Sequence, residues 1–406
     1  MQPRTVLVLV ENIPVRGDHR VWPECLALRE AGYEVVAISP RREKGEALVE
    51  REAGIEIHYF PLAAADDGML AYVKEYGLAF WRARRLVRKL ARQRRFDLVH
   101  ACNPPDFFLL AARPLKRQRT RFIFDQHDLF PELFITRFGK RRAMVRLLLL
   151  LERLTYRQAD VVLSTNESYR KIALTRGRKS PEDVFVVRNG PDLSRFRPNP
   201  DLSLKRGRPH LISFVGEMGF QDGVDQAVRA LGLVARKRRD WHAIFAGHGP
   251  ALEEARALTE ELGIADSVEF PGFVSDETVM RIVSSSDLCL APEPKNPFND
   301  ASTMIKIAEY MALSRPIVAY ELTESKVTAG EAALYATPNR VESFAGRIEE
   351  LLEDPELRIR MGEIGRSRVE EMFSWARSKE SLLAAYDHAL REAGEQELAS
   401  RAGATA

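Results

Sequence analysis

The sequence has no hydrophobic run long enough to cross a lipid bilayer. Its longest aliphatic run extends only from Leu147 to Leu151, whereas a membrane-spanning helix needs about 20 apolar residues. The first apolar stretch, Val6 to Val10, is only as long as a strand and follows a single Arg4, unlike a signal peptide. We therefore expect a cytoplasmic protein.

Cysteine is scarce, and no metal-ligand motif is present. The three cysteines, Cys25, Cys102 and Cys289, are widely separated along the chain. This spacing is typical of core thiols in a reducing compartment, without disulfide pairing. His248 has no second histidine, cysteine or carboxylate at ligand spacing, so we predict no metal site.

Apolar and charged residues are both abundant in a long chain. With 406 residues, the chain is too long for one ordinary core and predicts two domains of roughly 150 to 200 residues each. Apolar residues make up 45% and charged residues 29% of the sequence, which is typical of a soluble globular protein.

Strand and helix patterns alternate along the whole chain, which predicts an α/β fold with parallel sheets covered by helices. The buried strands Asp97–Ala101 and Phe122–Asp125 are each followed by a polar loop, the first containing Asn103 and the second His127-Asp128. Because ligands bind beyond the carboxyl ends of strands in such sheets, these loops are candidate site loops.

A proline-rich, polar segment interrupts the alternation, and we interpret it as a linker. The tail of the chain is small and polar, and we predict that it is disordered. The predicted divisions are a first domain over 1–194, a linker over 195–209, a second domain over 210–375, a C-terminal helix over 376–392 and a disordered tail over 393–406.

Positive charge is concentrated in the first half of the chain. Residues 1–200 contain 37 lysines and arginines against 24 aspartates and glutamates. Two arginine-rich segments, Arg82–Arg95 and Arg137–Arg157, have helical apolar patterns that include Leu147 and Leu148. Two interpretations stay open: a basic helix face on anionic lipid headgroups, or a solvated face above a buried stripe. The segments lack interleaved exposed aromatics and any nucleic-acid motif, so we expect no nucleic acid partner.

The stretch 296–326 reads as a polar loop, a helix, a buried strand at Ile317–Tyr320 and a second polar loop. The small polar residues Asn299–Thr303 predict capping of the helix N-terminus, where free amides favour an anion. Lys306 and Glu309 fall on one face of that helix. The spacing alone fits either a phosphate site or an ordinary helix with a surface salt bridge.

A series of short motifs carries a resemblance to a known family. In chain order they are Val187–Asp192 (VRNGPD), Phe214–Gly216 (FVG), Ala246–Pro250 (AGHGP), Ala291-Pro292, Lys306–Ala312 (KIAEYMA) and Pro316–Ala319 (PIVA). Their order and spacing over about residues 5–390 resemble the retaining glycosyltransferases of the GT-B fold, family 4, also called glycosyl transferases group 1. The KxxEYMA sequence, in place of the usual two-glutamate motif, resembles a sub-branch of that family.

The resemblance implies two Rossmann-like domains that face a cleft, with the C-terminal helix returning to the first domain. It implies that the second domain binds a nucleotide-diphosphate sugar, that the first domain binds the acceptor, and that the sugar is transferred with retention of configuration. The nucleotide sugar is then a co-substrate, and no cofactor or divalent metal is expected.

The resemblance also assigns roles in the second domain. Glu309 matches the glutamate that holds the ribose of the sugar donor, whereas the family's other glutamate would fall at Ala301. Asp300, one residue earlier, is the candidate to supply that carboxylate to the donor. The family's diphosphate-binding Arg and Lys fall at Glu217 and Asp222, which reverses both charges. We therefore expect other groups to contact the sugar donor, with Lys306 in a catalytic role. The remaining candidates are Ser302, Thr303, Lys326, Gly216, Gly247 and His248.

In the first domain, His127 resembles the histidine that faces the reacting sugar, and Asp128 is a second catalytic candidate. Arg20 follows the first strand and is interpreted as a diphosphate contact, with a helix-capping salt bridge as the alternative. The candidate acceptor-side residues are Asp18, Asn103, Glu132 and Asn166.

We expect the acceptor to be a lipid-linked glycan in cell-surface polysaccharide biosynthesis, reached by peripheral attachment to the cytoplasmic face of the membrane. Two other functions stay open: a nucleotide-sugar epimerase of the same fold, and a non-catalytic nucleotide-sugar-binding subunit motivated by Ala301, Glu217 and Asp222. Isomerisation of the sugar donor in the absence of an acceptor would indicate an epimerase. Nucleotide binding with neither transfer nor slow hydrolysis of the donor would indicate a non-catalytic subunit.

Overall fold

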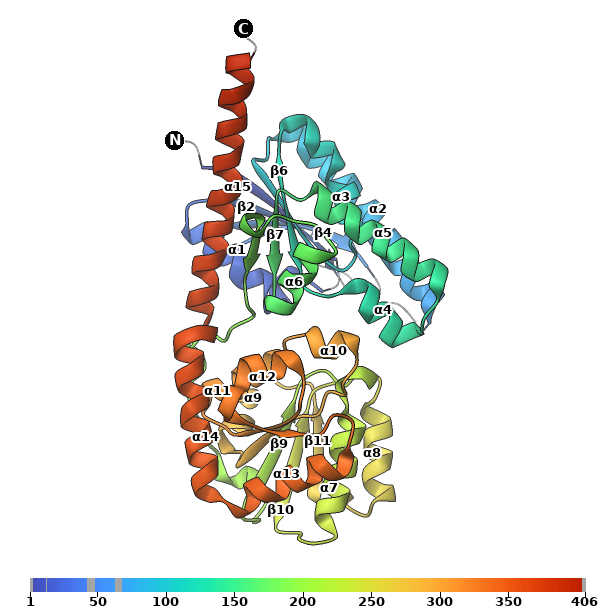
Figure 1. Ribbon diagram of the computed structural model, residues 1–406, viewed down its shortest axis with the longest axis vertical. Helices are drawn as coiled ribbons and strands as arrows, with labels where there is room; N and C mark the ends of the chain where they lie inside the picture. The colour runs from blue at the N-terminus through green and yellow to red at the C-terminus, as the bar shows by residue number, and fades with distance from the viewer. Residues whose placement is uncertain (1–2, 12, 42–47, 63–67, 404–406) are drawn as a thin grey trace. The chain divides into compact units, whose positions relative to one another are not determined.

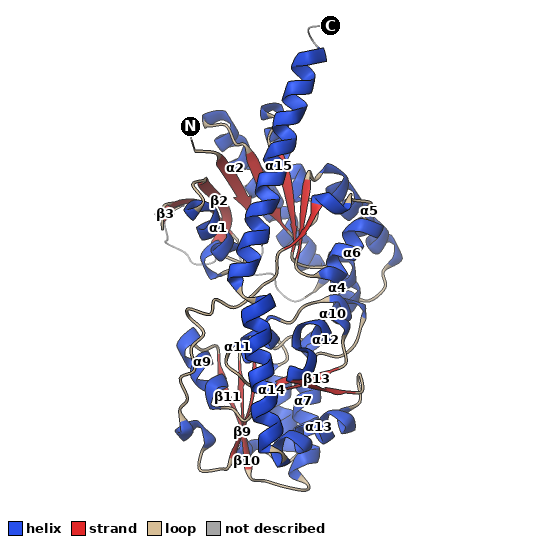
Figure 2. Ribbon diagram, turned by 60° about the vertical axis from the view of Figure 1, so that its left-hand side comes forward, coloured by secondary structure: helices blue, strands red, loops and turns tan. Residues whose placement is uncertain are grey.

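The computed structural model describes residues 3–11, 13–41, 48–62 and 68–403 (Figure 1). The chain folds into two compact units. Unit 1 consists of Met1–Asn189 together with Ser378–Ala406, and unit 2 consists of Gly190–Arg377. Each unit is a sheet with helices packed against it (Figure 2), so the prediction of two α/β domains with parallel sheets is confirmed.

The sheet of unit 1 has eight strands in the order β3-β4-β2-β1-β5-β6-β7-β8. All neighbouring pairs are parallel except β3, which runs antiparallel to β4 at the edge. The strands are β1 (Thr5–Leu9), β2 (Glu34–Arg41), β3 (Val49–Glu52), β4 (Ile55–Pro61), β5 (Leu98–Cys102), β6 (Arg121–Gln126), β7 (Val161–Ser164) and β8 (Val184–Val186).

Helices cover both faces of this sheet because alternate strand residues point to opposite sides. Val99 and Ala101 of β5 belong to a core that also contains Val87 of α2, whereas His100 between them contacts Tyr386 of α15. The helices of unit 1 are α1 (Val21–Glu30), α2 (Met69–Gln93), α3 (Phe108–Ala112), α4 (Phe130–Phe138), α5 (Arg142–Gln158), α6 (Glu167–Thr175) and most of α15 (Trp375–Gly403).

The C-terminal helix α15 belongs to unit 1 from Ser378 onward. Its Tyr386 is fully buried and places its ring edge against Tyr33, and His388 pairs with Asp183. The helix continues to Gly403, so the disordered tail predicted over 393–406 is wrong as far as residue 403. Alanine, glutamate, glutamine and leucine dominate this segment, and all four are strong helix formers. Residues 404–406 lie outside the described residues.

The sheet of unit 2 has six parallel strands in the order β11-β10-β9-β12-β13-β14. Strand β9 lies in the middle, and its neighbours β10 and β12 both follow it in the chain but lie on opposite sides of it. The strands are β9 (His210–Val215), β10 (Trp241–Ala246), β11 (Val268–Gly272), β12 (Leu288–Ala291), β13 (Ile317–Tyr320) and β14 (Ala333–Ala336).

Strand β9 shows how unit 2 buries both faces of its sheet. Ile212 and Phe214 pack into one core, whereas Leu211 and Val215 pack into another on the opposite face. Sheets covered on both sides therefore need nearly continuous apolar strands. The helices of unit 2 are α7 (Val224–Ala235), α8 (Leu252–Glu261), α9 (Asp276–Ser285), α10 (Pro297–Ala301), α11 (Ile305–Ala312), α12 (Thr323–Ala329), α13 (Val341–Glu353) and α14 (Pro355–Arg368).

Short turns connect several of these elements. One of them, η8, is a π-helix that continues α14, and the others are 3-10 helices. They are η1 (Val15–Gly17), η2 (Arg113–Gln118), η3 (Pro181–Asp183), η4 (Leu202–Lys205), η5 (Phe220–Asp222), η6 (Ala265–Ser267), η7 (Gly330–Ala332) and η8 (Val369–Phe373).

Three details of the fold differ from the sequence predictions. The segment 195–209 is not a free linker, because Asp201 bonds to Ser285 and Arg281 and Lys205 bonds to Asp287 within unit 2. The polar loop predicted after Tyr320 is the short helix α12. Helix α11 begins at Ile305 without a side-chain cap. Asn296 instead caps α10, by accepting hydrogen bonds from the amides of Phe298 and Asn299.

No helix among the described residues is both long and apolar enough to span a bilayer. The arginine-rich segment 137–157 is divided between α4, which ends at Phe138, and α5, which begins at Arg142. Leu148 of α5 is buried, but Leu147 is exposed, so the predicted buried stripe is narrower than the sequence indicated.

The burial of an aromatic side chain predicts how much its truncation should lower the free energy of unfolding of unit 2. Phe344 is fully buried against Tyr320, with ring centroids 4.9 Å apart. We expect Phe344→Ala to lower the free energy of unfolding by about 3 to 5 kcal/mol, because it leaves a cavity. Phe273 is 89% exposed, so Phe273→Ala should change it by less than about 0.5 kcal/mol. Equal effects in urea unfolding would contradict this core assignment.

Candidate functional site

The carboxyl edge of the unit 2 sheet collects most of the residues predicted to bind a sugar donor. Strand β9 ends at Val215 and β12 ends at Ala291, and these adjacent strands lead away to opposite sides of the sheet. Such a reversal in strand order is where open α/β sheets bind ligands. Gly216 follows β9, and helix α11 brings Lys306 to the same place, since a Cβ at Gly216 would lie 2.9 Å from Lys306 Cε.

Lys306 is held there by an ion pair and an aromatic ring. Its Nζ lies 2.6 Å from Oε1 of Glu293 and 4.2 Å from the centre of the Phe214 ring. Both charged side chains are buried, so each depends on the other to offset the cost of leaving water. Among the described residues, Oε2 of Glu293 has no hydrogen-bond partner. We call the Lys306–Glu293 pair at this edge the seat. It contains one cation and one carboxylate oxygen that can still accept a hydrogen bond.

Two further carboxylates lie near Lys306. Glu217 is exposed, whereas Asp222 is half-buried and accepts a hydrogen bond from the amide of Gly219. Burial raises the pKa of Asp222 to about 7, with Lys306 opposing the shift and Glu293 and Glu217 adding to it. The seat thus changes charge near neutral pH, and it accommodates an anion best when Asp222 is protonated.

Glycine is required where the loops after β9 and β10 meet. Gly247 has φ +147°, and a Cβ there would lie 1.8 Å from the carbonyl oxygen of Gly216. The amide of Gly216 donates to the carbonyl oxygen of Ala246, and the amide of Met218 donates to the carbonyl oxygen of His248. The close approach of these two backbones explains the glycines of the FVG and AGHGP motifs. The His248 side chain itself is exposed.

Of the remaining predicted residues of unit 2, two are half-buried next to or within α11, and two bond to other parts of the unit. Thr303 lies just before α11 and Glu309 in its middle, and both side chains are half-buried. Their contact with a ligand stays a prediction. Ser302 is buried, and its hydroxyl donates to the carbonyl of Phe298. Asp300 accepts hydrogen bonds from the amide and hydroxyl of Thr323, so it ties α10 to α12.

Lys326 was a second predicted cation for the diphosphate. Its Nζ lies 2.8 Å from Oε1 of Glu321 on an exposed part of α12. An exposed pair of this kind is weak, so the lysine can exchange its partner. The structure brings only Lys306 into the seat beside Gly216.

In unit 1, Asn103 joins the loops that follow β5 and β6. Its Oδ1 accepts from the amides of His127 and Asp128 at 2.6 and 3.1 Å, and its Nδ2 donates to the carbonyl of Asp128. Asn103 is buried, whereas His127 and Asp128 are partly exposed. The structure therefore places the two catalytic candidates at the carboxyl edge and gives Asn103 a supporting role.

Arg20 does not fit its predicted role as a diphosphate contact. Its guanidinium is buried and forms two hydrogen bonds to Asp125, at 2.9 and 2.6 Å. Its third nitrogen donates to the carbonyl of Val187 and to Asn189. Because all three nitrogens are hydrogen-bonded to residues of unit 1, the role of Arg20 is to connect buried parts of that unit.

Three predicted acceptor-side residues also have structural partners. Asp18 accepts from the amides of Arg20 and Val21 at the start of α1, and buried Asn166 caps α6. Glu132 forms a salt bridge with Arg176 at 2.5 Å. The same arginine pairs with Glu152, whose pKa is raised by burial to about 7 against the opposing effect of Arg176. The sequence could not show the distant Glu132–Arg176 pair, whereas Asp18 and Asn166 bond to amides two or three residues away.

A buried group that could hold a metal lies behind His127. Ligand atoms of His100, Cys102 and Asp125 lie within 4.8 Å of one another, the one such group among the described residues. Arg20 already occupies both oxygens of Asp125, and burial raises the pKa of the Cys102 thiol well above its usual value. A neutral thiol beside a guanidinium suits an ion-paired core better than a metal site.

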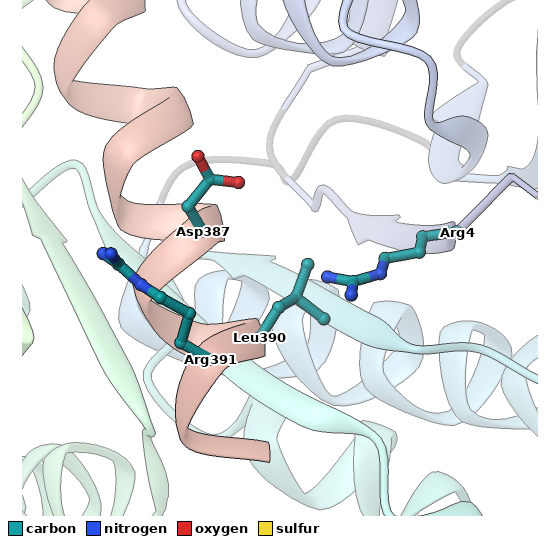
Figure 3. A pocket seen from close by; sticks show the side chains of 4 residues that line it. All are labelled: Arg4, Asp387, Leu390 and Arg391. Atoms are coloured by element: carbon teal, nitrogen blue, oxygen red, sulfur yellow. The ribbon is translucent and has the colours of Figure 1, made fainter. Parts of the chain in front are cut away.

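A cavity of about 330 Å³ in unit 1 lies away from these residues. It is lined by Arg4, which precedes β1, and by Asp387, Leu390 and Arg391 of α15 (Figure 3). Arg4 marks the amino edge of the sheet, whereas Asn103 and His127 follow its carboxyl edge. The cavity therefore has no part in the candidate site.

Two residues of the site escaped the sequence predictions. Glu293 is hidden between two prolines and stands far from Lys306 along the chain. Asp125 was assigned only to a strand, although it lies two residues before His127 on the same face of the chain. That two-residue spacing could have revealed the contact between Asp125 and His127, but it gives no sign of the contact between Glu293 and Lys306.

Two family matches cover most of the chain. Residues 19–190 match the family described as Glycosyl transferase 4-like domain, and residues 197–368 match the family described as Glycosyl transferases group 1. The first match falls on unit 1 and the second lies within unit 2. Unit 1 therefore carries a glycosyltransferase 4-like domain, and unit 2 carries a group 1 glycosyltransferase domain.

Its curated relatives are glycosyltransferases with different substrates. It is 25% identical over 365 residues to the putative glycosyltransferase EpsD of Bacillus subtilis, covering 83% of this chain and 90% of that protein. It is 30% identical over 155 residues to the alpha-D-kanosaminyltransferase of Streptomyces kanamyceticus, covering 38% and 39%. The matched region thus spans well under two thirds of the second relative.

Solved structures share the fold of this chain. Sucrose-phosphate synthase of Thermosynechococcus elongatus has a TM-score of 0.77 at 18% identity, covering 96% of this chain and 100% of that chain. The Anabaena protein HepE in complex with UDP-glucose has a TM-score of 0.68 at 16% identity, covering 94% and 99%. These likenesses confirm the GT-B fold.

Asp222 should make the stability of the protein depend on pH. Because its pKa is raised to about 7, the folded state holds this proton more tightly than the unfolded chain, and stability falls as pH rises from about 4 to about 7. Asp222→Asn should therefore gain stability relative to wild type over this window and hold the gain above it. Urea unfolding at four pH values measures this difference.

The control is Asp266→Asn, at an aspartate whose side chain is 70% exposed. It removes a carboxylate of the same unit away from Lys306. If the stability difference of Asp222→Asn from wild type does not change with pH, or changes only as that of Asp266→Asn does, the raised pKa is contradicted.

Proposed function

We propose that this glycosyltransferase moves a sugar from a nucleotide-diphosphate sugar to an acceptor hydroxyl, with retention of configuration and without a divalent metal. The observation that carries the proposal is the Lys306–Glu293 seat at the carboxyl edge of the unit 2 sheet. A buried cation at the point where the strand order reverses suits a diphosphate.

The ligand groups around the seat fit such a sugar donor. Lys306 supplies positive charge for the diphosphate at the first turn of α11, where free backbone amides also favour an anion. Glu309 is placed one turn further along the helix, where its carboxylate can accept hydrogen bonds from two ribose hydroxyls. The structural relative HepE is described with UDP-glucose, which supports a uridine nucleotide as the first candidate.

The proposed reaction proceeds on one face of the sugar. The bond between the anomeric carbon and the diphosphate oxygen breaks, and a bond to the acceptor oxygen forms on the same face. The acceptor proton passes to the departing phosphate oxygen. Lys306 stabilises the charge that develops on the leaving diphosphate, and His127 accepts a hydrogen bond from a sugar hydroxyl.

We further propose that the acceptor is a lipid-linked glycan and that unit 1 attaches to an anionic membrane. Leu147, Leu150 and Leu154 of α5 are exposed, with Leu150 at 54%, and their spacing puts them on one side of the helix. Arg146 and Arg153 are also exposed on α5. On α2, Trp81 is 66% exposed. Leucine, tryptophan and arginine together are typical of helices that lie in the membrane interface.

The seat is tested by removing both of its charges at once, because Lys306→Ala alone would leave Glu293 buried without a counter-ion. Lys306→Met/Glu293→Gln should lower turnover by about 100-fold or more, since it removes charge stabilisation of the leaving group. It should also abolish thermal stabilisation by the best of a panel of nucleoside diphosphates. Turnover is measured with the matching nucleotide sugars, with and without EDTA.

The matched control is Lys237→Met/Glu349→Gln, which removes a surface ion pair of the same unit with an N–O distance of 2.7 Å. This variant should keep full turnover and full nucleotide stabilisation. Unchanged turnover in the seat variant would contradict the proposal. Isomerisation of the nucleotide sugar in the absence of an acceptor would instead indicate an epimerase, and binding without any turnover a non-catalytic subunit.

The membrane surface is tested with vesicles that contain anionic lipid. Leu147→Ser/Leu150→Ser/Leu154→Ser should weaken co-sedimentation with these vesicles by about tenfold or more, because it removes apolar area from the docking face. Binding of the wild type should fall as salt is raised.

The control variant is Leu202→Ser/Phe273→Ser/Ile359→Ser, which changes three exposed apolar residues of unit 2. It should bind vesicles as the wild type does. If both triple variants bind equally well, α5 is not the docking surface.

A further inference from the structure

His127 does not stand alone at the carboxyl edge of the unit 1 sheet. Its ring nitrogen Nε2 lies 2.6 Å from Oδ2 of Asp125, the strand residue two positions earlier. The His127 side chain is 13% exposed, whereas Asp125 is fully buried. The ring thus has one nitrogen directed into the protein and one edge accessible from outside.

Asp125 is itself anchored from several sides. Arg20 binds both of its oxygens, with Nη2 at 2.6 Å from Oδ1 and Nε at 2.9 Å from Oδ2. His100 lies 3.2 Å from Oδ2, and its other nitrogen is 2.8 Å from the hydroxyl of Tyr386 on α15. A carboxylate bound in this way cannot rotate to follow a moving histidine.

The two buried carboxyl groups beside Arg20 have pKa values shifted in opposite directions. Burial alone would raise the pKa of Asp125, but Arg20, His127 and His100 outweigh it and hold that pKa well below its usual value. Glu24, 3.4 Å from Arg20, has its pKa raised well above the usual value by burial and by Asp125. Asp125 is therefore the ionised member and Glu24 the protonated one.

An ionised carboxylate can only accept a hydrogen bond. The proton between Asp125 and His127 must then belong to Nε2 of the histidine. In the neutral ring, this leaves Nδ1 without a proton and able to accept. Asn103 holds the backbone amide of His127 at 2.6 Å, so both the backbone and the ring are fixed.

We propose that Asp125, anchored by Arg20, is a positioning residue that fixes His127 as its Nε2–H tautomer and presents Nδ1 to a hydroxyl of the bound sugar. The inference rests on the proposed function for the identity of that hydroxyl. The tautomer itself follows from unit 1 alone. It gives Arg20 a role in the site through Asp125, in place of the phosphate contact predicted from the sequence.

The tautomer is read directly by NMR of the full-length protein labelled with ¹⁵N-histidine. The His127 signals are assigned by their loss in His127→Gln. At the alkaline end of a pH series, where the ring is neutral, we expect a proton on Nε2 and none on Nδ1. A proton on Nδ1 of the neutral ring overturns the proposal. Because the spectrum needs no substrate, this result is independent of whether the protein transfers a sugar.

The kinetic test is Asp125→Asn, which keeps the shape of the side chain but removes its charge. We expect kcat to fall by at least about tenfold with less than a twofold change in KM for the nucleotide sugar, together with a changed His127 tautomer ratio. A changed tautomer ratio with unaltered kcat overturns the positioning role. If this variant does not fold, the wild-type spectrum still decides the question.

The matched control is Glu24→Gln, in the same buried cluster. Glu24 lies near Arg20 and His100, as Asp125 does, but the described contacts of His127 do not include it. Glutamine resembles the protonated form of glutamate, so the variant should keep both the tautomer and kcat. A loss of kcat in Glu24→Gln equal to that in Asp125→Asn would reduce the Asp125 effect to general disruption of the cluster and overturn the proposal.

Discussion

The buried ammonium group of Lys306 constrains everything around it at the carboxyl edge of the unit 2 sheet. It needs a counter-ion, which Glu293 provides at 2.6 Å, and it needs space, which Gly216 provides by having no side chain. It also lowers the cost of burying Asp222, whose pKa nevertheless reaches about 7. A phosphate arriving at this edge would meet a cation that is already desolvated and held in place, so little reorganisation is needed on binding.

Unit 1 uses the same physical device for a different purpose. Arg20 and Asp125 are buried as a pair with two hydrogen bonds between them. Asp125 is also 2.6 Å from Nε2 of His127. In unit 2 the Lys306–Glu293 pair places an ammonium group at the carboxyl edge of the sheet. In unit 1 the Arg20–Asp125 pair holds the ring of His127 there. Both pairs lie where parallel strands end, the region in which loops rather than strands determine chemistry.

The sequence predicted the fold better than the roles of single residues. Apolar strands alternating with amphipathic helices are local patterns, and they indicated both sheets. The polar residues after the strands were correctly placed at the carboxyl edges, but Arg20 and Glu132 are engaged by partners distant in the sequence, which no local pattern reveals. Asp18 and Asn166 instead bond to amides two or three residues away, and this capping role was overlooked. Glu293 was missed for the converse reason, because its importance arises only when α11 folds back toward β12.

The central claim is that the Lys306–Glu293 seat binds the diphosphate of the sugar donor. A crystal structure of the full-length protein with UDP, or with the nucleoside diphosphate that stabilises it best, tests this most directly. The account predicts the diphosphate within hydrogen-bonding distance of Lys306 Nζ and the ribose hydroxyls on Glu309. A nucleotide bound elsewhere, with the Lys306–Glu293 pair untouched, would contradict it.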